Sequence, residues 1–181
     1  TAKDLGPGMC LIDKWIRKNS KSNYDEKGIT AQSGKINNLV LKKLIENFYN
    51  KKKFLKAGFI QSFDTQFFDY SFVKNLSLGD GAATLTQFTV EIIISAIKSS
   101  DRYKEEIILC GGGRKNNFLV NKLKKEINRI KLIDEYKVDG DFIESQAFAY
   151  LAIRSFLGLP ISFPETTGVN KPVTGGTIIK N

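Results

Sequence analysis

Three consecutive glycines, Gly111, Gly112 and Gly113, stand between an apolar, β-branched run and a helix-like pattern. A strand that ends in glycines and leads into a helix lets a ligand approach the backbone, and the helix N-terminus adds free N–H groups and a partial positive charge. In open α/β sheets, ligands bind at the carboxyl ends of strands, where these glycines fall. The stretch suits a nucleotide site, although a plain glycine turn capped by Asn116 explains it equally well.

The spacing Gly111-x-Gly113-x-x-Asn116 also approaches a dinucleotide fingerprint, with Asn in place of the third glycine. Asp134 follows Gly113 by 21 residues (134 − 113), about where an acid that binds ribose would stand. A Rossmann-like nucleotide-binding domain is therefore a weaker alternative. The stretch is not a phosphate loop of the GxxxxGK[ST] type.

Two acids stand beside turns. Asp4 precedes Gly6 and Gly8 in a Gly-Pro-Gly turn that leads into a helical pattern, so its carboxylate could act as a general base near a phosphate, or simply stabilise its own turn. Glu144 stands in the pattern Asp141-x-x-Glu144, which resembles a capping box. Glu144 could close that helix or bind a sugar hydroxyl, and the residues alone leave both readings open.

Composition excludes several kinds of function. The 181 residues contain no histidine, which excludes imidazole bases and Ser-His-Asp triads. The net charge is +9, but Lys and Arg are scattered and the aromatic residues follow apolar positions, so no nucleic-acid partner is expected. No segment is long enough to span a membrane and the N-terminus does not resemble a signal peptide, so the expected location is cytoplasmic, without a membrane partner.

The first half of the chain, residues 1–100, predicts mainly helices. Apolar residues at helical spacing indicate helices over 9–19, 35–50, 67–76 and 80–99. Asp80 is a plausible N-cap of the last of these. Residues 20–34 are polar and rich in Ser, Asn and Gly, which favours a loop.

The second half, residues 101–181, predicts β-α-β-α with a last strand. The expected strands are 105–110, which is apolar enough to be buried, 130–133 and 173–179. The expected helices are 116–128 and 141–157, the latter closed by Gly158. The length suits a single α/β domain over residues 1–181.

Five segments together resemble one family. They are DLGPGMCLIDKWI (4–16), DGAATLTQFTVEII (80–93), CGGGRKNNFL (110–119), DGDFIESQAFAYLAIR (139–154) and GLP…TTGVNKPVTGG (158–176). In this order they are similar to the C-terminal half of anhydro-N-acetylmuramic acid kinases, over nearly the whole chain.

The resemblance implies a fold and a reaction. The expected fold is the ribonuclease-H-like C-terminal domain of an actin-like ATPase, with a mixed sheet flanked by helices and with the N-terminal strands and first domain missing. The implied enzyme is bacterial and cytoplasmic and serves cell-wall recycling. It uses ATP and Mg²⁺ to open 1,6-anhydro-N-acetylmuramic acid with water while phosphorylating O6. A homodimer is implied, and the missing half could be supplied by a separate N-terminal partner.

The resemblance also implies roles for particular residues. Asp4 matches the base that activates water, and Glu144 matches a ligand of the amino-sugar substrate. The implied nucleotide contacts are Gly6, Gly8, Gly111, Gly112, Gly113 and Asn116.

Three positions depart from the family pattern. Leu5 and Met9 replace a Thr and an Asn beside the expected base, and neither side chain can make the same hydrogen bonds. Thr65, in the segment from Gln61 to Gln66, replaces an Arg and loses a forked anion donor. These departures support an alternative, a catalytically inactive remnant or interaction module that keeps the fold.

Overall fold

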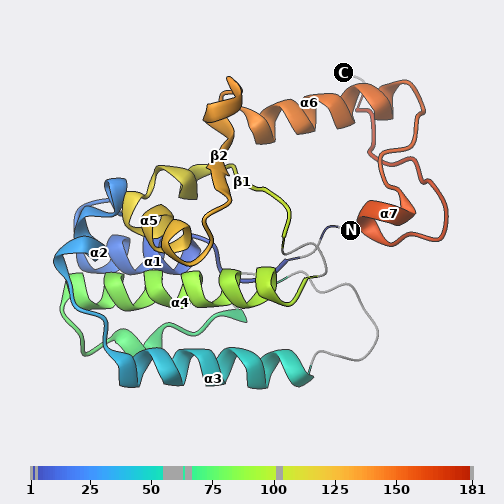
Figure 1. The fold of residues 1–181 in the computed structure, drawn as a ribbon. Helices are drawn as coiled ribbons and strands as arrows, with labels where there is room; N and C mark the ends of the chain where they lie inside the picture. Colours follow the sequence, from blue (N-terminus) through green and yellow to red (C-terminus); the bar gives the residue numbers. More distant parts are fainter. Residues whose placement is uncertain (1, 3, 55–62, 64–66, 101–103, 180–181) are drawn as a thin grey trace.

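The computed structural model describes residues 2, 4–54, 63, 67–100 and 104–179 (Figure 1). The expected departure at Thr65 lies outside these residues. The helices are α1 (Cys10–Asn19), α2 (Ile29–Ser33), α3 (Asn38–Phe54), α4 (Leu78–Lys98), α5 (Asn117–Glu126), α6 (Ile143–Phe156) and α7 (Pro164–Thr167), and the strands are β1 (Ile107–Leu109) and β2 (Ile130–Leu132). Within these ranges, no helix combines the length and apolar content needed to cross a bilayer.

Helix α4 is the centre of the fold. Its sequence is apolar almost all round, as in a helix surrounded by protein. Leu85 and Phe88 belong to a core cluster that also contains residues of α1, α2 and α3, whereas Val90 and Ile94 belong to a second cluster with α5 and β2. In Figure 1, α4 accordingly lies between α3 on one side and α1 and α2 on the other.

The contact between α1 and α4 is very close. Trp15 is 2% exposed, and its Nε1 donates a hydrogen bond of 3.0 Å to the carbonyl of Leu78 at the start of α4. A Cβ added at Gly81 would lie 2.5 Å from the Trp15 indole carbons. Only glycine leaves room for the indole at this crossing.

The expected loop over residues 20–34 is wrong in its second half, which contains a 3₁₀ turn (Glu26–Gly28) and α2. The carboxylate of Asp25 accepts the backbone N–H groups of Thr30 and Ala31 at 2.8 and 2.9 Å, so it satisfies the free donors at the start of α2. Ala31 is fully buried in the first core cluster. The Asp25 hydrogen bonds and the burial of Ala31 therefore stabilise a helix that the polar composition of this segment does not predict.

Helix α4 exists as expected, but Asp80 is not its N-cap. Ser77 is the cap, and its side chain accepts the backbone N–H of Asp80 at 3.1 Å. The Asp80 carboxylate instead accepts the backbone N–H of Lys35 at 2.7 Å. Asp80 thus ties the segment before α3 to the first turn of α4.

The helix expected over 67–76 is also wrong, because the described part of this segment contains a 3₁₀ turn at Ser71–Val73. Its aromatic residues pack instead as part of a cluster around Phe48 of α3. Phe68 stacks on Phe48 at 6.0 Å between ring centroids, and Phe67 and Phe88 meet it edge-on. Packing of the rings outweighs the weak helical pattern.

Strands β1 and β2 pair in parallel, with Ile107 opposite Ile130. β1 is not buried as expected, because Ile108 is 44% exposed. The strand expected over 173–179 is wrong as well: there, the described residues form an isolated antiparallel bridge between Ser162 and Val173. The described part of the chain is therefore a helix-rich α/β fold with a small parallel sheet rather than the expected mixed sheet.

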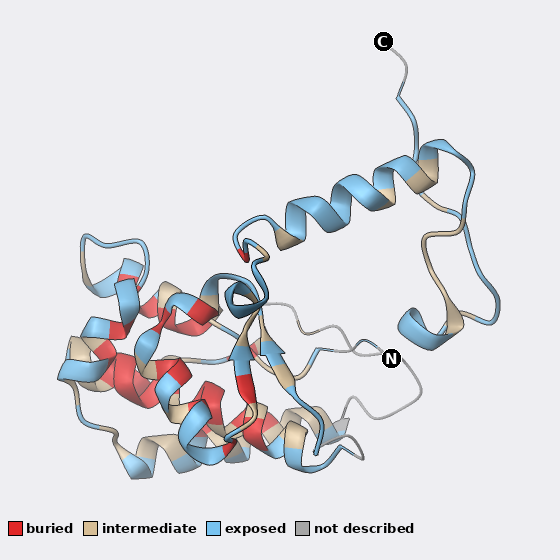
Figure 2. Ribbon diagram, turned by 45° about the horizontal axis from the view of Figure 1, so that its top comes forward, coloured by how far each residue is buried: buried red, intermediate tan, exposed pale blue. Residues whose placement is uncertain are grey.

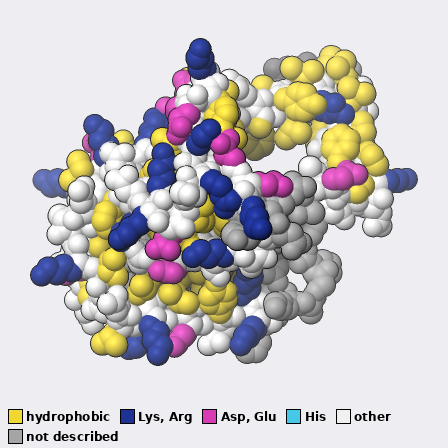
Figure 3. Space-filling view, in the orientation of Figure 1, with side chains coloured by type: hydrophobic (Ala, Val, Ile, Leu, Met, Phe, Trp, Pro, Cys, Tyr) yellow, Lys and Arg dark blue, Asp and Glu magenta, His cyan; other side chains and the backbone are white. Residues whose placement is uncertain are grey.

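Residues 142–179, here called the C-terminal arm, extend from the body that holds the core (Figures 1 and 2). The arm contains α6 and α7 and no buried residue. Apolar side chains nevertheless gather over it (Figure 3). Phe148, Ile153 and Phe156 of α6 are 60% or more exposed.

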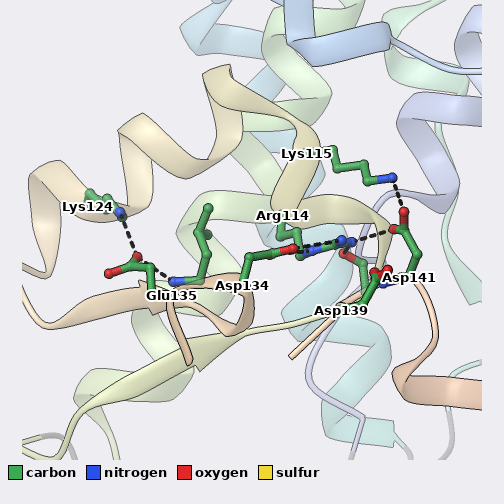
Figure 4. A network of polar contacts seen from close by, with 9 residues as sticks. Arg114, Lys115, Lys124, Asp134, Glu135, Asp139 and Asp141 are labelled. Atoms are coloured by element: carbon green, nitrogen blue, oxygen red, sulfur yellow. Dashed lines mark hydrogen bonds and ion pairs between the residues drawn. The ribbon is translucent and has the colours of Figure 1, made fainter. Parts of the chain in front are cut away.

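Of the two readings left open for Asp141-x-x-Glu144, the capping box is absent, because no side chain caps α6. Asp141 instead belongs to an ion-pair network around Arg114 (Figure 4). The Arg114 side chain is 4% exposed, and its Nε lies 2.7 Å from Asp134 and its Nη1 2.8 Å from Asp141. Lys115 also pairs with Asp141, at 2.5 Å. The network fastens the glycine turn to the segments that follow β2.

We predict that Gly81→Ala destabilises the protein, although alanine normally favours a helix. The added methyl group must displace the Trp15 indole, and overpacking of this kind lowers the free energy of unfolding by about 1–3 kcal/mol. Urea unfolding followed by Trp15 fluorescence measures it. Lys98→Ala, on the exposed end of α4, is the control and should change the free energy by less than about 0.5 kcal/mol. Equal stability of Gly81→Ala and wild type would contradict this packing.

We also predict that the network makes stability depend on pH. Hydrogen bonds from Arg114 lower the pKa of Asp134, and those from Lys115 and then Arg114 lower the pKa of Asp141. A lowered pKa stabilises the fold above the ordinary aspartate value of about 4, and the contribution is lost as pH falls through the lowered values. Asp134→Asn should therefore lower the melting temperature at pH 7, and the difference from wild type should shrink below pH about 4. A difference independent of pH would contradict this role.

Candidate functional site

A cavity of about 460 Å³ opens between the start of α1, the segment before α2 and the glycine turn. Its walls include Met9, Asp13, Gly112, Gly113 and Asn116. Met9 also packs on the turn, because its Cγ lies 3.4 Å from where a Cβ of Gly113 would stand. Asp13 and Gly113, which are 100 positions apart in sequence (113 − 13), therefore face one space.

The glycine turn presents open backbone to this cavity. Gly111 has φ +75° and ψ −178°, a conformation that glycine adopts readily and other residues avoid. A 3₁₀ turn (Gly112–Lys115) follows and leads into α5. A Cβ added at Gly111 or Gly112 would meet nothing within 4 Å. The absence of side chains here thus leaves space beside the backbone, as a phosphate or ribose would require.

Asn116 combines a structural and a free polar group. Its Oδ1 accepts the backbone N–H of Leu119 at 2.9 Å, which confirms the expected N-cap of α5. The residue is 3% exposed. Its Nδ2 is buried and, among the described atoms, has no hydrogen-bond partner. A buried donor without a partner costs free energy. Asn116 belongs to the cavity wall, but its Nδ2 has almost no accessible surface, so a ligand could reach that atom only if the side chain moved.

Asp13 is a second such group, which the sequence reasoning missed. Its Oδ1 is buried and has no hydrogen-bond partner among the described atoms. Burial raises the pKa of the Asp13 carboxyl, Arg17 lowers it and the nearby Asp25 raises it further. The available signal was an acid between Ile12 and Trp15 on the apolar face of α1.

The structure brings Gly8 to the glycine turn but not Gly6. Gly8 and Gly113 line a second cavity of about 200 Å³, and the Gly8 carbonyl accepts a hydrogen bond of 3.0 Å from the hydroxyl of Thr89 on α4. Gly6 packs against α4, because its Cβ would lie 2.7 Å from Ile92. The role expected of Gly6 in phosphate binding remains a prediction.

Asp4 and Glu144 line neither cavity. Asp4 is exposed, and its carboxylate accepts the backbone N–H of Phe63 at 2.9 Å. Glu144 is exposed in the first turn of α6, on the C-terminal arm. The described fold therefore does not join the expected base and sugar ligand to the glycine turn. Asp134, the ribose acid of the Rossmann interpretation, is engaged by Arg114 instead.

No group of three or more Asp, Glu, Cys or His side chains suited to a metal ion occurs within the described ranges. What the site offers is space beside the open backbone of Gly112 and Gly113.

Comparison with known proteins shows which family this chain belongs to. The family model described as anhydro-N-acetylmuramic acid kinase matches residues 1–181. Curated proteins of that name are similar to this chain: one from Pelagibacter ubique is 49% identical over 98% of this chain and 48% of its own length. One from Caulobacter vibrioides is 39% identical over 98% and 47%, and one from Zymomonas mobilis is 36% identical over 98% and 47%. The chain thus spans about half the length of these relatives, and it belongs to the anhydro-N-acetylmuramic acid kinase family.

Proposed function

We propose that this chain carries the nucleotide site of an ATP-dependent sugar kinase that acts on 1,6-anhydro-N-acetylmuramic acid. The observation that carries the proposal is the backbone of Gly112 and Gly113, which lines the 460 Å³ cavity beside Asn116. Membership of the family supplies the substrate. We also assign the reaction to the recycling of cell-wall sugars.

The proposed reaction forms two bonds and breaks two. Water attacks C1 of the sugar and loses a proton to a base, and the bond between C1 and O6 breaks. O6 then forms a bond to the γ-phosphorus of ATP while ADP leaves. Asp4 is the proposed base and Glu144 the proposed sugar ligand, as the family resemblance implies. Mg²⁺ bound through the ATP phosphates and water would supply positive charge at the phosphoryl group that is transferred.

Within the cavity, the backbone of Gly112 and Gly113 is the proposed contact of the nucleotide phosphates. Backbone donors at a helix N-terminus favour anions and need no rearrangement during the reaction. Lys27 and Lys115 also line the cavity, together with the acids Asp13, Asp25 and Asp141, and Lys115 is paired with Asp141. The Met9 side chain lies against Gly113 and thus shapes the same space.

We further propose that the kinase needs a second half, on the same polypeptide or a separate one. The relatives are about twice the length of the matched region, and Asp4 and Glu144 lie apart from the cavity. The apolar side chains of α6, among them Phe148, Ile153 and Phe156, offer a surface for that half. This surface equally suits the alternative of an interaction module without activity. A homodimer, implied by the family, is a separate proposal.

The test is turnover. Purified chain is incubated with ATP, Mg²⁺ and 1,6-anhydro-N-acetylmuramic acid, alone and with the remaining half of the Pelagibacter ubique relative added in trans. Mass spectrometry should then detect the ring-opened 6-phosphate. We expect product only with the second half present, because a half-built cleft neither orients both substrates nor excludes bulk water.

Asp4→Asn tests the base, and Gly112→Ala tests the turn. Asp4→Asn should lower kcat by about 100-fold or more, because an amide cannot accept the proton. Gly112→Ala should keep the melting temperature, since its Cβ meets nothing within 4 Å, but should raise KM for ATP. Absence of product in every mixture would favour the inactive interaction module.

A further inference from the structure

We propose that the outer face of α1, together with the segment around Tyr70, binds the phosphate backbone of a nucleic acid. The net charge of the chain is +9, but Lys and Arg are scattered along it, so the sequence predicts no nucleic-acid partner. The structure brings several of these cations to one surface, where they form the electrostatic signature of nucleic-acid binding. This surface, here called the basic face, comprises Lys14, Arg17, Lys18, Lys51 and Lys74.

Helix α1 supplies three of these cations because of their spacing. Lys14, Arg17 and Lys18 stand at positions i, i+3 and i+4, which share one face of a helix, and all three are exposed. The opposite face of α1 is buried in the core, where Ile12 is fully buried and Trp15 is 2% exposed. The spacing therefore gives α1 a cationic outer face.

Tyr70 brings two of these amines together. The Nζ atoms of Lys14 and Lys18 lie 5.2 and 6.0 Å from the centroid of its ring, as in cation–π contacts. Within the described ranges, neither lysine forms an ion pair with an acid. Their positive charges are therefore available to an anion from outside the chain.

Lys51 and Lys74 extend the basic face beyond α1. Both lie near Asp69, the residue before Tyr70. The backbone N–H of Ser71 lowers the pKa of the Asp69 carboxyl most, and the charges of Lys51 and Lys74 lower it further. The cations of α1 and these two lysines thus meet around the Tyr70 segment.

The basic face keeps a net positive charge although two acids interact with it. Asp69 is one of them. The other is Asp13, whose pKa is raised by burial and lowered by the charge of Arg17. Five cations against two carboxylates leave a positive potential that attracts a polyanion.

The chemistry of the basic face favours nucleic acid over the other anionic partners. A helix binds a bilayer by inserting its apolar face, but the apolar face of α1 is buried in the core. Lysine is depleted in protein–protein interfaces. Phosphates, in contrast, are bound by Lys and Arg side chains, and such contacts carry no sequence information. Binding should therefore be independent of base sequence.

Fluorescence anisotropy with labelled oligonucleotides of about 20 residues tests the proposal on the whole chain. The probes are single-stranded RNA, single-stranded DNA and duplex DNA, which share the phosphate chain. At least one should bind, and its affinity should fall about 50- to 150-fold between about 50 and 200 mM salt, because about four phosphate contacts release counterions. Failure of all three probes to bind at the lower salt concentration would overturn the proposal.

Two double variants with the same net charge assign the binding to the basic face. Lys14→Glu combined with Lys18→Glu should weaken binding by about tenfold or more, because two cations become anions. Lys124→Glu combined with Lys125→Glu makes the same charge change on α5, which packs in the other core cluster. This control should weaken binding by about threefold or less, because salt screens distant charges. Equal losses would overturn the proposal by assigning binding to net charge alone.

Further controls separate effects on folding and the other anionic partners. Thermal unfolding verifies that each variant is folded. Should the Glu pair unfold, Lys14→Gln combined with Lys18→Gln removes charge without adding repulsion and should weaken binding about three- to tenfold. Binding to phosphatidylglycerol vesicles but to no oligonucleotide would overturn the proposal in favour of a membrane. Binding of poly-glutamate as tight as that of every oligonucleotide would overturn it in favour of an acidic protein.

Discussion

The burial of α4 on both faces is the constraint on which the rest of the structure depends. One side of this helix packs on α1, α2 and α3, and the other on α5 and β2, so it joins two core clusters that would otherwise be separate. Its apolar residues account for most of that packing. Burying the hydroxyl groups of α4 costs free energy unless they are hydrogen-bonded. Thr86 donates to the carbonyl of Ala82, and Thr89 donates to the carbonyl of Gly8. The bond from Thr89 holds the Gly8 turn beside the glycine turn.

The described sheet is small, so contacts other than strand pairing must hold the residues of the candidate site in place. The sheet contributes two short strands, and it is the ion pairs of Arg114 with Asp134 and Asp141 that fix the backbone after β1. These ion pairs hold the glycine turn beside the cavity. The C-terminal arm differs, because it exposes apolar side chains and contains no buried residue. The relatives are about twice as long as the matched region, and we propose that residues of that other half pack on the arm.

Sequence reasoning predicted what local patterns encode. The apolar periodicity of α1, α3, α4 and α5, the Asn116 cap and the order β-α-β-α were all confirmed. Sequence reasoning failed where contacts between residues distant in sequence determine the local structure. The Asp25 carboxylate accepts N–H groups of α2, a helix that packs in the core. Asp141 accepts a hydrogen bond from Arg114 rather than capping α6. Asp13 was missed because the sequence shows an acid on the apolar face of α1 but does not show that one of its carboxylate oxygens is buried.

The most direct measurement of the central claim is hydrogen–deuterium exchange of the chain with and without ATP. The claim is that the space between α1 and the glycine turn binds the nucleotide. We predict slower exchange on adding ATP at the backbone amides of residues 111–119 and at the start of α1, with little change in α3 or α7. Protection confined to other segments, or none at ATP concentrations that saturate binding, would contradict the account.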